Sequence, residues 1–478
     1  MSPGDNRHDH SRRLREQTPK SEQLHERAAE VTPLGVESNV RSFDPYPFYV
    51  CLLYTSVRSF DPYPFYVEET SGSTVTDIDG NEYLDFLLAL GPIILGHNHP
   101  DVTSAVKAQA ERADLTATPQ RIAIEFMERI VEMTPSIEQV RLANSGTEAT
   151  MHAIRTARSY TGNDLIAKPE GGYAGAHDYA LMSVYADEEA LGPKERPNTV
   201  SYGTGIPDVV EDTVVAIPFN DKENTEAVLR EHADDLAAVI IEPVMFSAGC
   251  LKPQDGYHEF LRELTEELDI VLIWDEVMTG FRLGPASAQG RFGVTPDMTT
   301  FAKAAGGGYQ VGGFGGKREI MAEIEPPEDE DAESWHSSAF HGGTYNGHPV
   351  SCAAGLATLD VLQNEDVYEH IDRMGERLFE GLQEVADDVG LPVNVQYVGS
   401  MGQVYMTDHE IRHYRDTWHA NSEQYADWWR EAAAGGALFG NPMQSERFFT
   451  TYTHSEEEID RALSIAEDAF NEVNHEYE

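Results

Sequence analysis

The chain has 478 residues, of which 40% are hydrophobic and 9% aromatic, as in a globular protein that buries a sizeable core. Its 83 acidic residues outnumber its 34 lysines and arginines, so the formal net charge is −49. Such a charge repels nucleic acid and anionic membranes and needs concentrated salt to screen it, so we expect a halophilic protein that binds neither.

Cysteine usage and hydropathy narrow the class further. The cysteines Cys51, Cys250 and Cys352 show no paired spacing, which excludes a disulfide or zinc framework, and we expect no bound metal. The first residues lack the apolar core of a signal peptide, and no later stretch approaches the length that spans a bilayer. We therefore expect a cytoplasmic protein.

The N-terminal hundred residues hold a polar arm and a repeat. Residues 1–25 are polar and are expected to be loosely ordered, with a helix beginning near Ser21. The sequence VRSFDPYPFYV then occurs at 40–50 and again, unchanged, at 57–67. We interpret the second occurrence as a cloning or assembly duplication, because a structural repeat would be longer and divergent. Alternating residues around Asp79 and Gly80 predict a β-hairpin, so 26–100 is assigned to a small domain.

The middle of the chain has the pattern of an α/β domain. Between 101 and 360, helical patterns alternate with short apolar strands at 236–241, 270–274 and 311–314. This alternation predicts a mainly parallel sheet with helices on both faces, and cofactor sites in such sheets lie at the carboxyl ends of the strands. Residues 361–478 return to helices with two further strands, and we assign them to the smaller α/β domain.

Two charged residues stand where they could act on a bound ring. Asp275 follows the apolar strand in VLIWDEVMTGFR, and an ionised carboxylate there could keep a pyridinium nitrogen protonated. A helix cap or a metal ligand would look the same. Lys303, in FAKAAGGGYQVGG, lies in an apolar run where desolvation would favour the neutral, nucleophilic amine that forms a Schiff base. The alternative is an ordinary surface lysine.

Two hydroxyl-bearing and glycine-bearing segments precede helical patterns. Ser145, Gly146 and Thr147 open one such pattern, and backbone N–H groups at a helix start bind phosphate. Thr344, in HGGTYNGHP, precedes another. Either segment alone is equally compatible with a plain helix cap. Combined with an aspartate and a lysine, they indicate a phosphorylated ring as the ligand.

In this order, the stretches NSGTEA, DEVMTGFR, FGVTPDMTTFAK and GGKREIM resemble the class III, or fold-type I, pyridoxal-phosphate aminotransferases, over the chain from about residue 35 onward. The resemblance implies pyridoxal 5′-phosphate as cofactor and a homodimer with active sites at the subunit interface. It also implies roles for individual residues: the Schiff-base lysine Lys303, the pyridine partner Asp275, the phosphate site Ser145, Gly146 and Thr147, the ring-face residues Val277 and Tyr173, Glu242 at the cofactor site, and Thr344 at the neighbouring subunit's phosphate.

Within the family, the likeness is greatest to the aminomutases that convert glutamate-1-semialdehyde to 5-aminolevulinate. It implies that Ser38 and the arginine of VRSF, which the repeat offers as Arg41 or Arg58, lie near the substrate carboxylate. Glu446 would lie near the substrate's amino groups. The chain departs from the family in two places: Ala174 replaces the usual histidine, and the segment 182–210 is longer than the aminomutase lid.

Two other functions stay open. The chain could be an aminotransferase of an ω- or β-amino acid with pyruvate or 2-oxoglutarate as acceptor, and Arg447 is available to bind a dicarboxylate. In another class, it could be a protein that binds the cofactor or a partner without catalysis. A requirement for a keto acid distinguishes the first alternative, and cofactor binding without reaction on any amine distinguishes the second.

Overall fold

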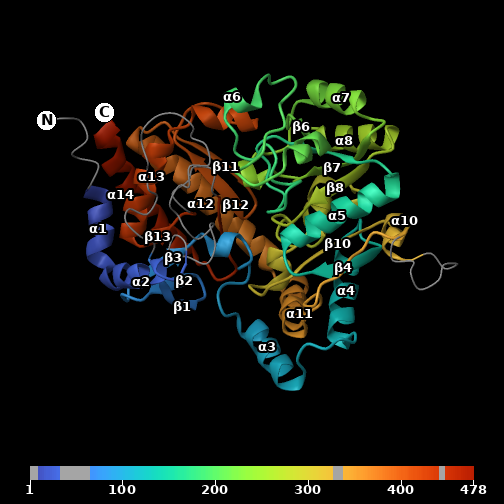
Figure 1. Cartoon of the computed structure of the whole chain (residues 1–478). Helices are drawn as coiled ribbons and strands as arrows, with labels where there is room; N and C mark the ends of the chain where they lie inside the picture. The colour runs from blue at the N-terminus through green and yellow to red at the C-terminus, as the bar shows by residue number, and fades with distance from the viewer. Residues whose placement is uncertain (1–8, 33–64, 327–336, 441–446, 478) are drawn as a thin grey trace. The chain divides into compact units, whose positions relative to one another are not determined.

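The computed structural model describes residues 9–32, 65–326, 337–440 and 447–477 (Figure 1). Two compact units make up the chain: a small unit of Met1–Asn98, Glu369–Ile411 and Arg415–Glu478, and a large unit of His99–Tyr368 and Arg412–Tyr414. No helix among the described residues is both long and apolar enough to cross a membrane. The sequence-based boundaries at 25, 100 and 360 stay predictions.

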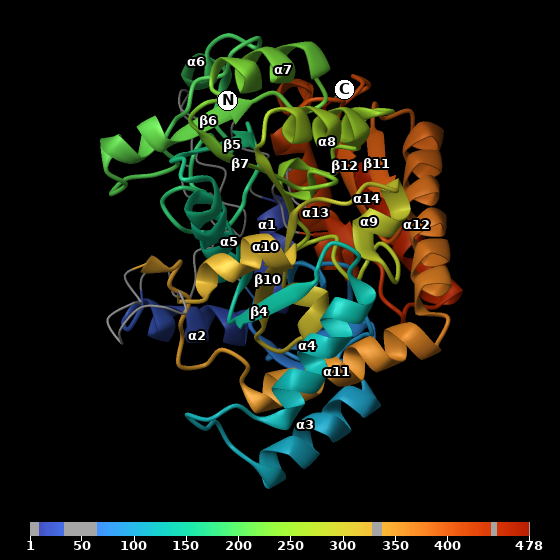
Figure 2. The same ribbon diagram turned by 90° about the vertical axis from the view of Figure 1, so that its right-hand side faces the viewer.

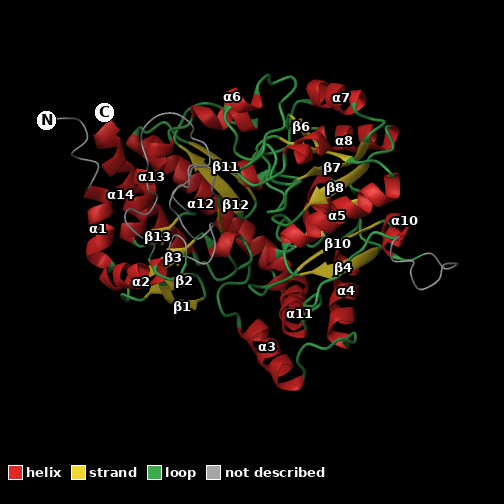
Figure 3. Cartoon of the chain, in the orientation of Figure 1, coloured by secondary structure: helices red, strands yellow, loops and turns green. Residues whose placement is uncertain are grey.

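The large unit is built on a seven-stranded sheet with the order β4-β10-β9-β8-β7-β5-β6 (Figure 3). Strands β9, β8, β7, β5 and β6 pair in parallel, whereas β10 is antiparallel to both of its neighbours. The mainly parallel sheet expected from the sequence is therefore confirmed. The strands are β4 (Gln139–Ala143), β5 (Leu165–Pro169), β6 (Val214–Ile217), β7 (Leu236–Ile241), β8 (Val271–Asp275), β9 (Met298–Phe301) and β10 (Gly312–Gly316).

Helices alternate with these strands along the chain (Figure 2). Helix α5 begins after the N-cap Ser145 and ends before Gly162, whose φ of +74° closes the last turn in the left-handed region. The helices of the large unit are α3 (Pro100–Arg112), α4 (Arg121–Met133), α5 (Gly146–Thr161), α6 (Glu188–Leu191), α7 (Lys222–Glu231), α8 (Tyr257–Glu267), α9 (Ser287–Phe292), α10 (Arg318–Met321) and α11 (Pro349–Asn364).

Side-chain alternation along β8 decides which residues face which helix. Ile273 packs in the same core cluster as Ala153 of α5. Trp274, one residue later, packs on His258 of α8, with ring centroids 4.9 Å apart. Because successive side chains of a strand point to opposite faces, α5 and α8 cover opposite faces of the sheet. The same alternation carries Asp275 to the α5 face.

The small unit contains two sheets, one in the order β1-β2-β3-β13 and one in the order β11-β12-β14. The predicted hairpin is present, since β2 and β3 pair in antiparallel fashion around Gly80, which has a φ of +93°. The strands are β1 (Val67–Ser71), β2 (Thr74–Asp77), β3 (Glu82–Asp85), β11 (Asn394–Val398), β12 (Met401–Tyr405), β13 (Ala437–Leu438) and β14 (Phe448–Phe449).

The helices of the small unit include α2, which confirms the helix expected near Ser21, and α1, which the sequence did not predict. The expectation of a loosely ordered N-terminal arm is wrong for residues 9–17. Leu14 is buried in the main hydrophobic core of this unit, and the buried hydroxyl of Ser21 accepts a hydrogen bond from the Tyr66 N–H at 3.1 Å. The helices are α1 (Asp9–Gln17), α2 (Pro19–Ala29), α12 (Val367–Val389), α13 (Ser422–Gly435) and α14 (Glu456–Tyr477).

The repeated segment meets the fold at its second occurrence. The first occurrence, at 40–50, lies outside the described residues, and the second is described only from Phe65 onward. The ring of Phe65 stacks on Tyr83 with centroids 4.9 Å apart, and Val67 begins β1. The end of the second occurrence is therefore part of the folded small unit, whereas its origin as a duplication stays a hypothesis.

Candidate active site

Asp275, the last residue of β8, offers a buried carboxylate with one oxygen available. Only 4% of the residue is exposed. Its Oδ1 accepts hydrogen bonds from the Thr300 hydroxyl at 3.0 Å and from the Val277 N–H at 3.1 Å, which leaves Oδ2 for another donor. Burial raises the pKa of Asp275 to about 6, although both hydrogen bonds and the charge of Lys303 oppose the rise. A cationic donor at Oδ2 would offset the cost of this charge.

Glu276, the next residue, points to the other face of the sheet, and both of its carboxylate oxygens already accept hydrogen bonds. Its oxygens accept hydrogen bonds from the Thr279 hydroxyl at 3.0 Å, the Ala288 N–H at 2.8 Å and the Gln289 amide at 3.0 Å. Burial raises its pKa to about 7. The two adjacent carboxylates are thus distinguished by strand alternation and by the hydrogen bonds that each has already made.

Lys303 lies directly after β9 in a strained backbone conformation. It opens the short turn η6 (Lys303–Gly306), is half-buried, and has a φ of +44°, in the left-handed region that residues with a Cβ rarely adopt. Its Nζ contacts the sulfur of Met278, and its charge lowers the pKa of Asp275. The structure therefore brings the predicted lysine and aspartate together, and local strain of this kind is common at active sites.

The start of α5 has the chemistry of an anion site. Ser145 Oγ caps the helix by accepting from the Glu148 N–H at 3.1 Å, and Thr147 Oγ1 accepts from the Ala176 N–H at 3.0 Å. Both hydroxyls keep their hydrogen for another acceptor. The N–H groups of Gly146 and Thr147 have no acceptor within the helix, because the first turn has none to offer, and the helix dipole favours negative charge there.

Close approach at this point requires glycine. A Cβ on Gly146 would lie 2.9 Å from both γ carbons of Val277, and one on Gly175 would lie 2.9 Å from the Thr147 Cα. Gly175 also has a φ of +108°. The glycines thus allow the start of α5 to lie against both Val277, two residues after Asp275, and the loop that follows Tyr173.

Tyr173 is held by a hydrogen-bonded relay from β7. Its N–H donates to Ser247 Oγ at 2.9 Å, and both the hydroxyl and the N–H of Ser247 donate to Glu242, the latter at 3.2 Å. The pairing of Ile241 with Trp274 sets Glu242 level with Asp275 across β7 and β8. Tyr173 as a residue remains 36% exposed, so its aromatic side chain is accessible to a ligand.

The other predicted residues are not joined to this cluster in the described part of the chain. Thr344 lies in an exposed turn, and none of the hydrogen bonds among the described residues links it to the remaining site residues. The predicted substrate residues lie outside the described residues; they are Ser38, Arg41, Arg58 and Glu446. Arg447 is described, and it is buried in the small unit with 7% of the residue exposed.

Sequence reasoning missed three residues of the cluster. Thr300 could have been found, since β8 and β9 are adjacent and their register pairs it with Asp275. Lys168 also gave a signal, because it is one of only eight lysines and stands in the apolar strand LIAKP. Ser247 gave none, since a serine in a loop has no pattern of its own.

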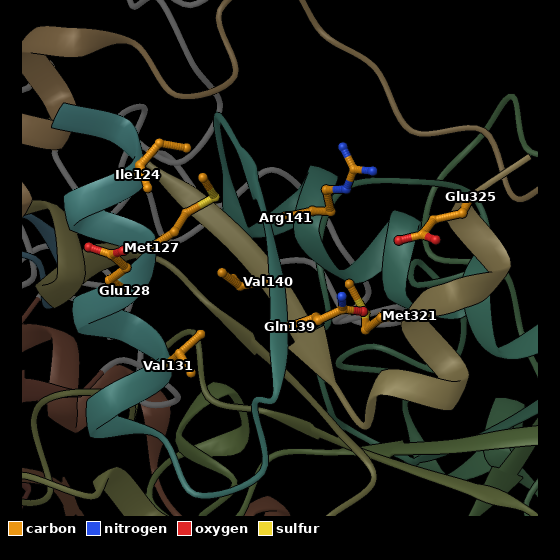
Figure 4. Close-up of a pocket in the computed structure, with 9 residues that line it drawn as sticks. All are labelled: Ile124, Met127, Glu128, Val131, Gln139, Val140, Arg141, Met321 and Glu325. Carbon is orange, nitrogen blue, oxygen red and sulfur yellow. The ribbon is translucent and has the colours of Figure 1, made fainter. Parts of the chain in front are cut away.

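The pocket in Figure 4 lies elsewhere in the large unit. It has a volume of about 390 Å³ and opens between α4, the edge strand β4 and the region of α10. None of the residues predicted for the cofactor or the substrate lines it. Its lining residues are Ile124, Met127, Glu128, Val131, Gln139, Val140, Arg141, Met321 and Glu325.

Comparison with known proteins gives the family. The family model described as Aminotransferase class-III matches residues 55–470. The chain belongs to the class-III aminotransferases. A glutamate-1-semialdehyde 2,1-aminomutase from Thermoplasma volcanium is 38% identical over 95% of this chain and 100% of that protein. Another from Methanothrix thermoacetophila is 40% identical over 93% of this chain and 94% of that protein.

Solved structures of the same family share the fold. The crystal structure of an omega-transaminase from Sphaerobacter thermophilus superposes with a TM-score of 0.84 at 31% identity, covering 95% of this chain and 98% of that one. Class-III aminotransferases depend on pyridoxal phosphate, and this chain is accordingly a pyridoxal-phosphate enzyme.

The residues of the cluster fit this cofactor. Asp275 Oδ2 is available for the N–H of a pyridinium ring, and the hydroxyls of Ser145 and Thr147 are available for a phosphate. Lys303 stands next to Asp275 and could reach an aldehyde carbon on the same ring. The arrangement thus offers a partner for each polar group of the cofactor.

Proposed function

We propose that this class-III aminotransferase is a glutamate-1-semialdehyde 2,1-aminomutase, which rearranges glutamate-1-semialdehyde to 5-aminolevulinate. The observation that carries the proposal is the 38–40% identity to relatives of that name over nearly the whole of both chains. The substrate is a small molecule, in keeping with the family. The cluster around Asp275 and Lys303 supports the amino-transfer chemistry that such a rearrangement needs.

In the proposed mechanism, the chain's residues hold the cofactor and move a proton. Pyridoxal phosphate, when bound, supplies an electron sink that makes the C–H bond next to an amino group acidic. We assign to Lys303 both covalent attachment of the cofactor and proton transfer at that carbon. Asp275 keeps the ring nitrogen protonated, because a buried negative charge favours the cationic form of its neighbour.

The remaining cofactor residues orient the ring. We assign the phosphate to the N–H groups and hydroxyls at Ser145, Gly146 and Thr147, where partial positive charge faces an anion. Val277 and Tyr173 are assigned to opposite ring faces, with Tyr173 as the aromatic platform. Such positioning contributes to catalysis because the reacting atoms no longer have to be brought into register in each turnover.

For the substrate, the assignment rests on the family likeness alone. Ser38 and either Arg41 or Arg58 remain the proposed partners of the substrate carboxylate, and Glu446 remains the proposed neighbour of its amino groups. A carboxylate bound by an arginine makes a pair of charge-assisted hydrogen bonds. Separate Arg41→Ala and Arg58→Ala variants would tell which arginine serves, since only the one at the site should raise KM.

We also infer a homodimer in which each subunit completes its neighbour's site. Thr344 is exposed on the single chain and is flanked by exposed aromatic residues, Phe340 at 60% and Tyr345 at 57%. Exposed aromatic residues of this kind are enriched at protein interfaces. Light scattering coupled to gel filtration in high salt checks the stoichiometry.

The physiological setting is proposed from charge and cysteine chemistry. The formal net charge of −49 supports a protein that works in concentrated salt, where its self-repulsion is screened. Cys250 and Cys352 are buried, and Cys352 is a free thiol, as is usual in a reducing compartment; we propose a cytoplasmic location.

A second candidate is an intermolecular aminotransferase of an ω- or β-amino acid. It is favoured by the 31% identity to the omega-transaminase of Sphaerobacter thermophilus and by the segment 182–210, which is longer than the aminomutase lid. The first residues of that segment are packed in place: Met182 and Val184 are buried, and the Ser183 N–H donates to the Val200 carbonyl at 2.6 Å. A lid that opens and closes would be expected to pack less closely.

The test is an assay without any amino acceptor. The purified protein, loaded with pyridoxal phosphate in high salt, is given glutamate-1-semialdehyde alone, and 5-aminolevulinate is measured. Production of 5-aminolevulinate that Lys303→Ala abolishes would support the aminomutase. Turnover that requires another amine and a keto acid would replace it with the aminotransferase, and binding without any turnover would contradict both.

A further inference from the structure

Lys168 places an ammonium group inside the large unit, next to the loop that carries Tyr173. It is the penultimate residue of β5 and is 1% exposed. Its Nζ donates to the Gly172 carbonyl at 2.7 Å and to the Met182 carbonyl at 2.6 Å, with the Pro169 carbonyl at 3.4 Å. All three acceptors are backbone carbonyls. The ammonium therefore fixes the backbone conformation of this loop and does not pair with a side chain through these bonds.

Two successive residues of the loop, Gly171 and Gly172, have no side chain that could anchor it. It turns through Gly171, which has a φ of +79°, and through Gly172, whose N–H donates to the Pro169 carbonyl at 3.2 Å. The Gly171 N–H donates to the Ser183 carbonyl at 2.8 Å. Lys168 therefore holds both this turn and Met182, the first residue of the segment 182–210.

Two buried charges hold Tyr173 from opposite sides. Glu242 acts on the N–H of Tyr173 through the Ser247 hydroxyl, whereas Lys168 acts on the carbonyl of Gly172, the residue before it. Strand alternation places Lys168 on the same face as Ile166, which shares the core cluster that packs against α5. Burial lowers the pKa of Lys168 to about 7, and the negative charge of Glu242 opposes this shift.

We propose that Lys168 is a positioning residue that sets the Tyr173 ring for the cofactor. The inference rests on the proposed cofactor site, since the place of Tyr173 matters only if its ring contacts the bound cofactor. Burying an ammonium group destabilises the fold unless its N–H groups donate hydrogen bonds. Here the acceptors are loop carbonyls, so these bonds form only in the loop conformation that places Tyr173 as observed. Removing the ammonium releases the carbonyls and lets the ring move.

The test is a double-mutant cycle on cofactor affinity. Lys168→Met, Tyr173→Ala and the double variant are prepared without cofactor, and each is titrated with pyridoxal phosphate to give a Kd. Lys168→Met should weaken binding roughly tenfold in the parent protein but less than about twofold in the Tyr173→Ala background, since residues that act through one another are not additive. Lys222→Met, at an exposed lysine that donates to the Asp255 carbonyl, is the matched control and should leave the Kd unchanged.

The outcomes separate this inference from the function on which it rests. Equal effects of Lys168→Met in both backgrounds would overturn the positioning role. If Lys168→Met does not fold, Lys168→Gln keeps two N–H donors without the charge and undergoes the same cycle. Loss of folded protein in both variants would overturn the inference in favour of a purely structural lysine. Failure of the unmutated protein to bind pyridoxal phosphate at all would instead overturn the proposed function.

Discussion

Replacing Asp275 by asparagine separates what this carboxylate costs the fold from what it contributes to the reaction. Its pKa is raised from 3.8 to about 6 by burial, so the folded protein binds this proton more tightly than the unfolded chain does. The loss of folding stability caused by burying the ionised carboxylate is therefore absent well below pH 4. It grows between pH 4 and 6 and is complete above pH 6. Its full size is about 3 kcal/mol at 1.4 kcal/mol for each pH unit.

Asparagine keeps an oxygen for the Val277 N–H and the Thr300 hydroxyl but removes the charge. Weaker hydrogen bonds to the neutral amide return part of the gain, so we expect Asp275→Asn to stabilise the cofactor-free protein by about 1–2 kcal/mol at pH 8. The gain should fall by about 1.4 kcal/mol, to near zero, at pH 5, where the native carboxyl is mostly protonated. Turnover of the loaded enzyme should fall at least about 100-fold, because the buried charge opposite the ring nitrogen is lost.

Urea unfolding of the cofactor-free protein in high salt, at pH 8 and pH 5, measures the stability change. Glu276→Gln is the matched control: its amide replaces one of two oxygens that already accept hydrogen bonds, so it should destabilise the protein even though the pKa of Glu276 is also raised. The reasoning is refuted if Asp275→Asn destabilises the protein at pH 8, or if it lowers turnover no more than Glu276→Gln.

Three further outcomes are expected. Gly146→Ala would place a methyl group 2.9 Å from both γ carbons of Val277 and should weaken pyridoxal-phosphate binding about tenfold. The double variant Gly146→Ala, Val277→Ala should recover part of this affinity. Additive losses of affinity in the two substitutions would contradict the prediction. Raising KCl from about 0.1 to about 3 M should raise the midpoint of thermal unfolding, because 83 acidic residues face 34 basic ones; a midpoint indifferent to salt would speak against halophily. Thr344→Ala should weaken cofactor binding several-fold in the dimer while leaving the Tm of the cofactor-free protein within about a degree; an unchanged Kd would remove this residue from the neighbour's site.

Much of the fold could be predicted because hydrophobic periodicity has a local cause. The strands at 236–241 and 270–274 were found within a residue, since a doubly covered parallel strand must be apolar on both faces. Helix α1, in the arm expected to be loosely ordered, could not be predicted in this way. Its packing depends on partners far along the chain, because Leu14 is buried among core residues such as Leu378 and Trp428.

At the candidate site, too, residues with a local sequence signal could be predicted, whereas residues that depend on tertiary contacts could not. Asp275 and Lys303 were singled out by their place after a strand and before a glycine-rich turn, and the structure brings them close together. The relay that holds Tyr173 was invisible, because Ser247 and Lys168 reach it only through tertiary hydrogen bonds. Strand alternation was a further unused signal, since it assigns Asp275 and Glu276 to opposite faces from sequence alone.

The central claim is that Lys303 carries the cofactor, and the most direct test is to trap the attachment chemically. The loaded protein is reduced with borohydride, digested, and mapped by mass spectrometry for a lysine bearing the pyridoxyl-phosphate group. The account predicts that the label lies on Lys303. A label on Lys168, whose pKa burial lowers to about 7, or on no lysine at all, would contradict it.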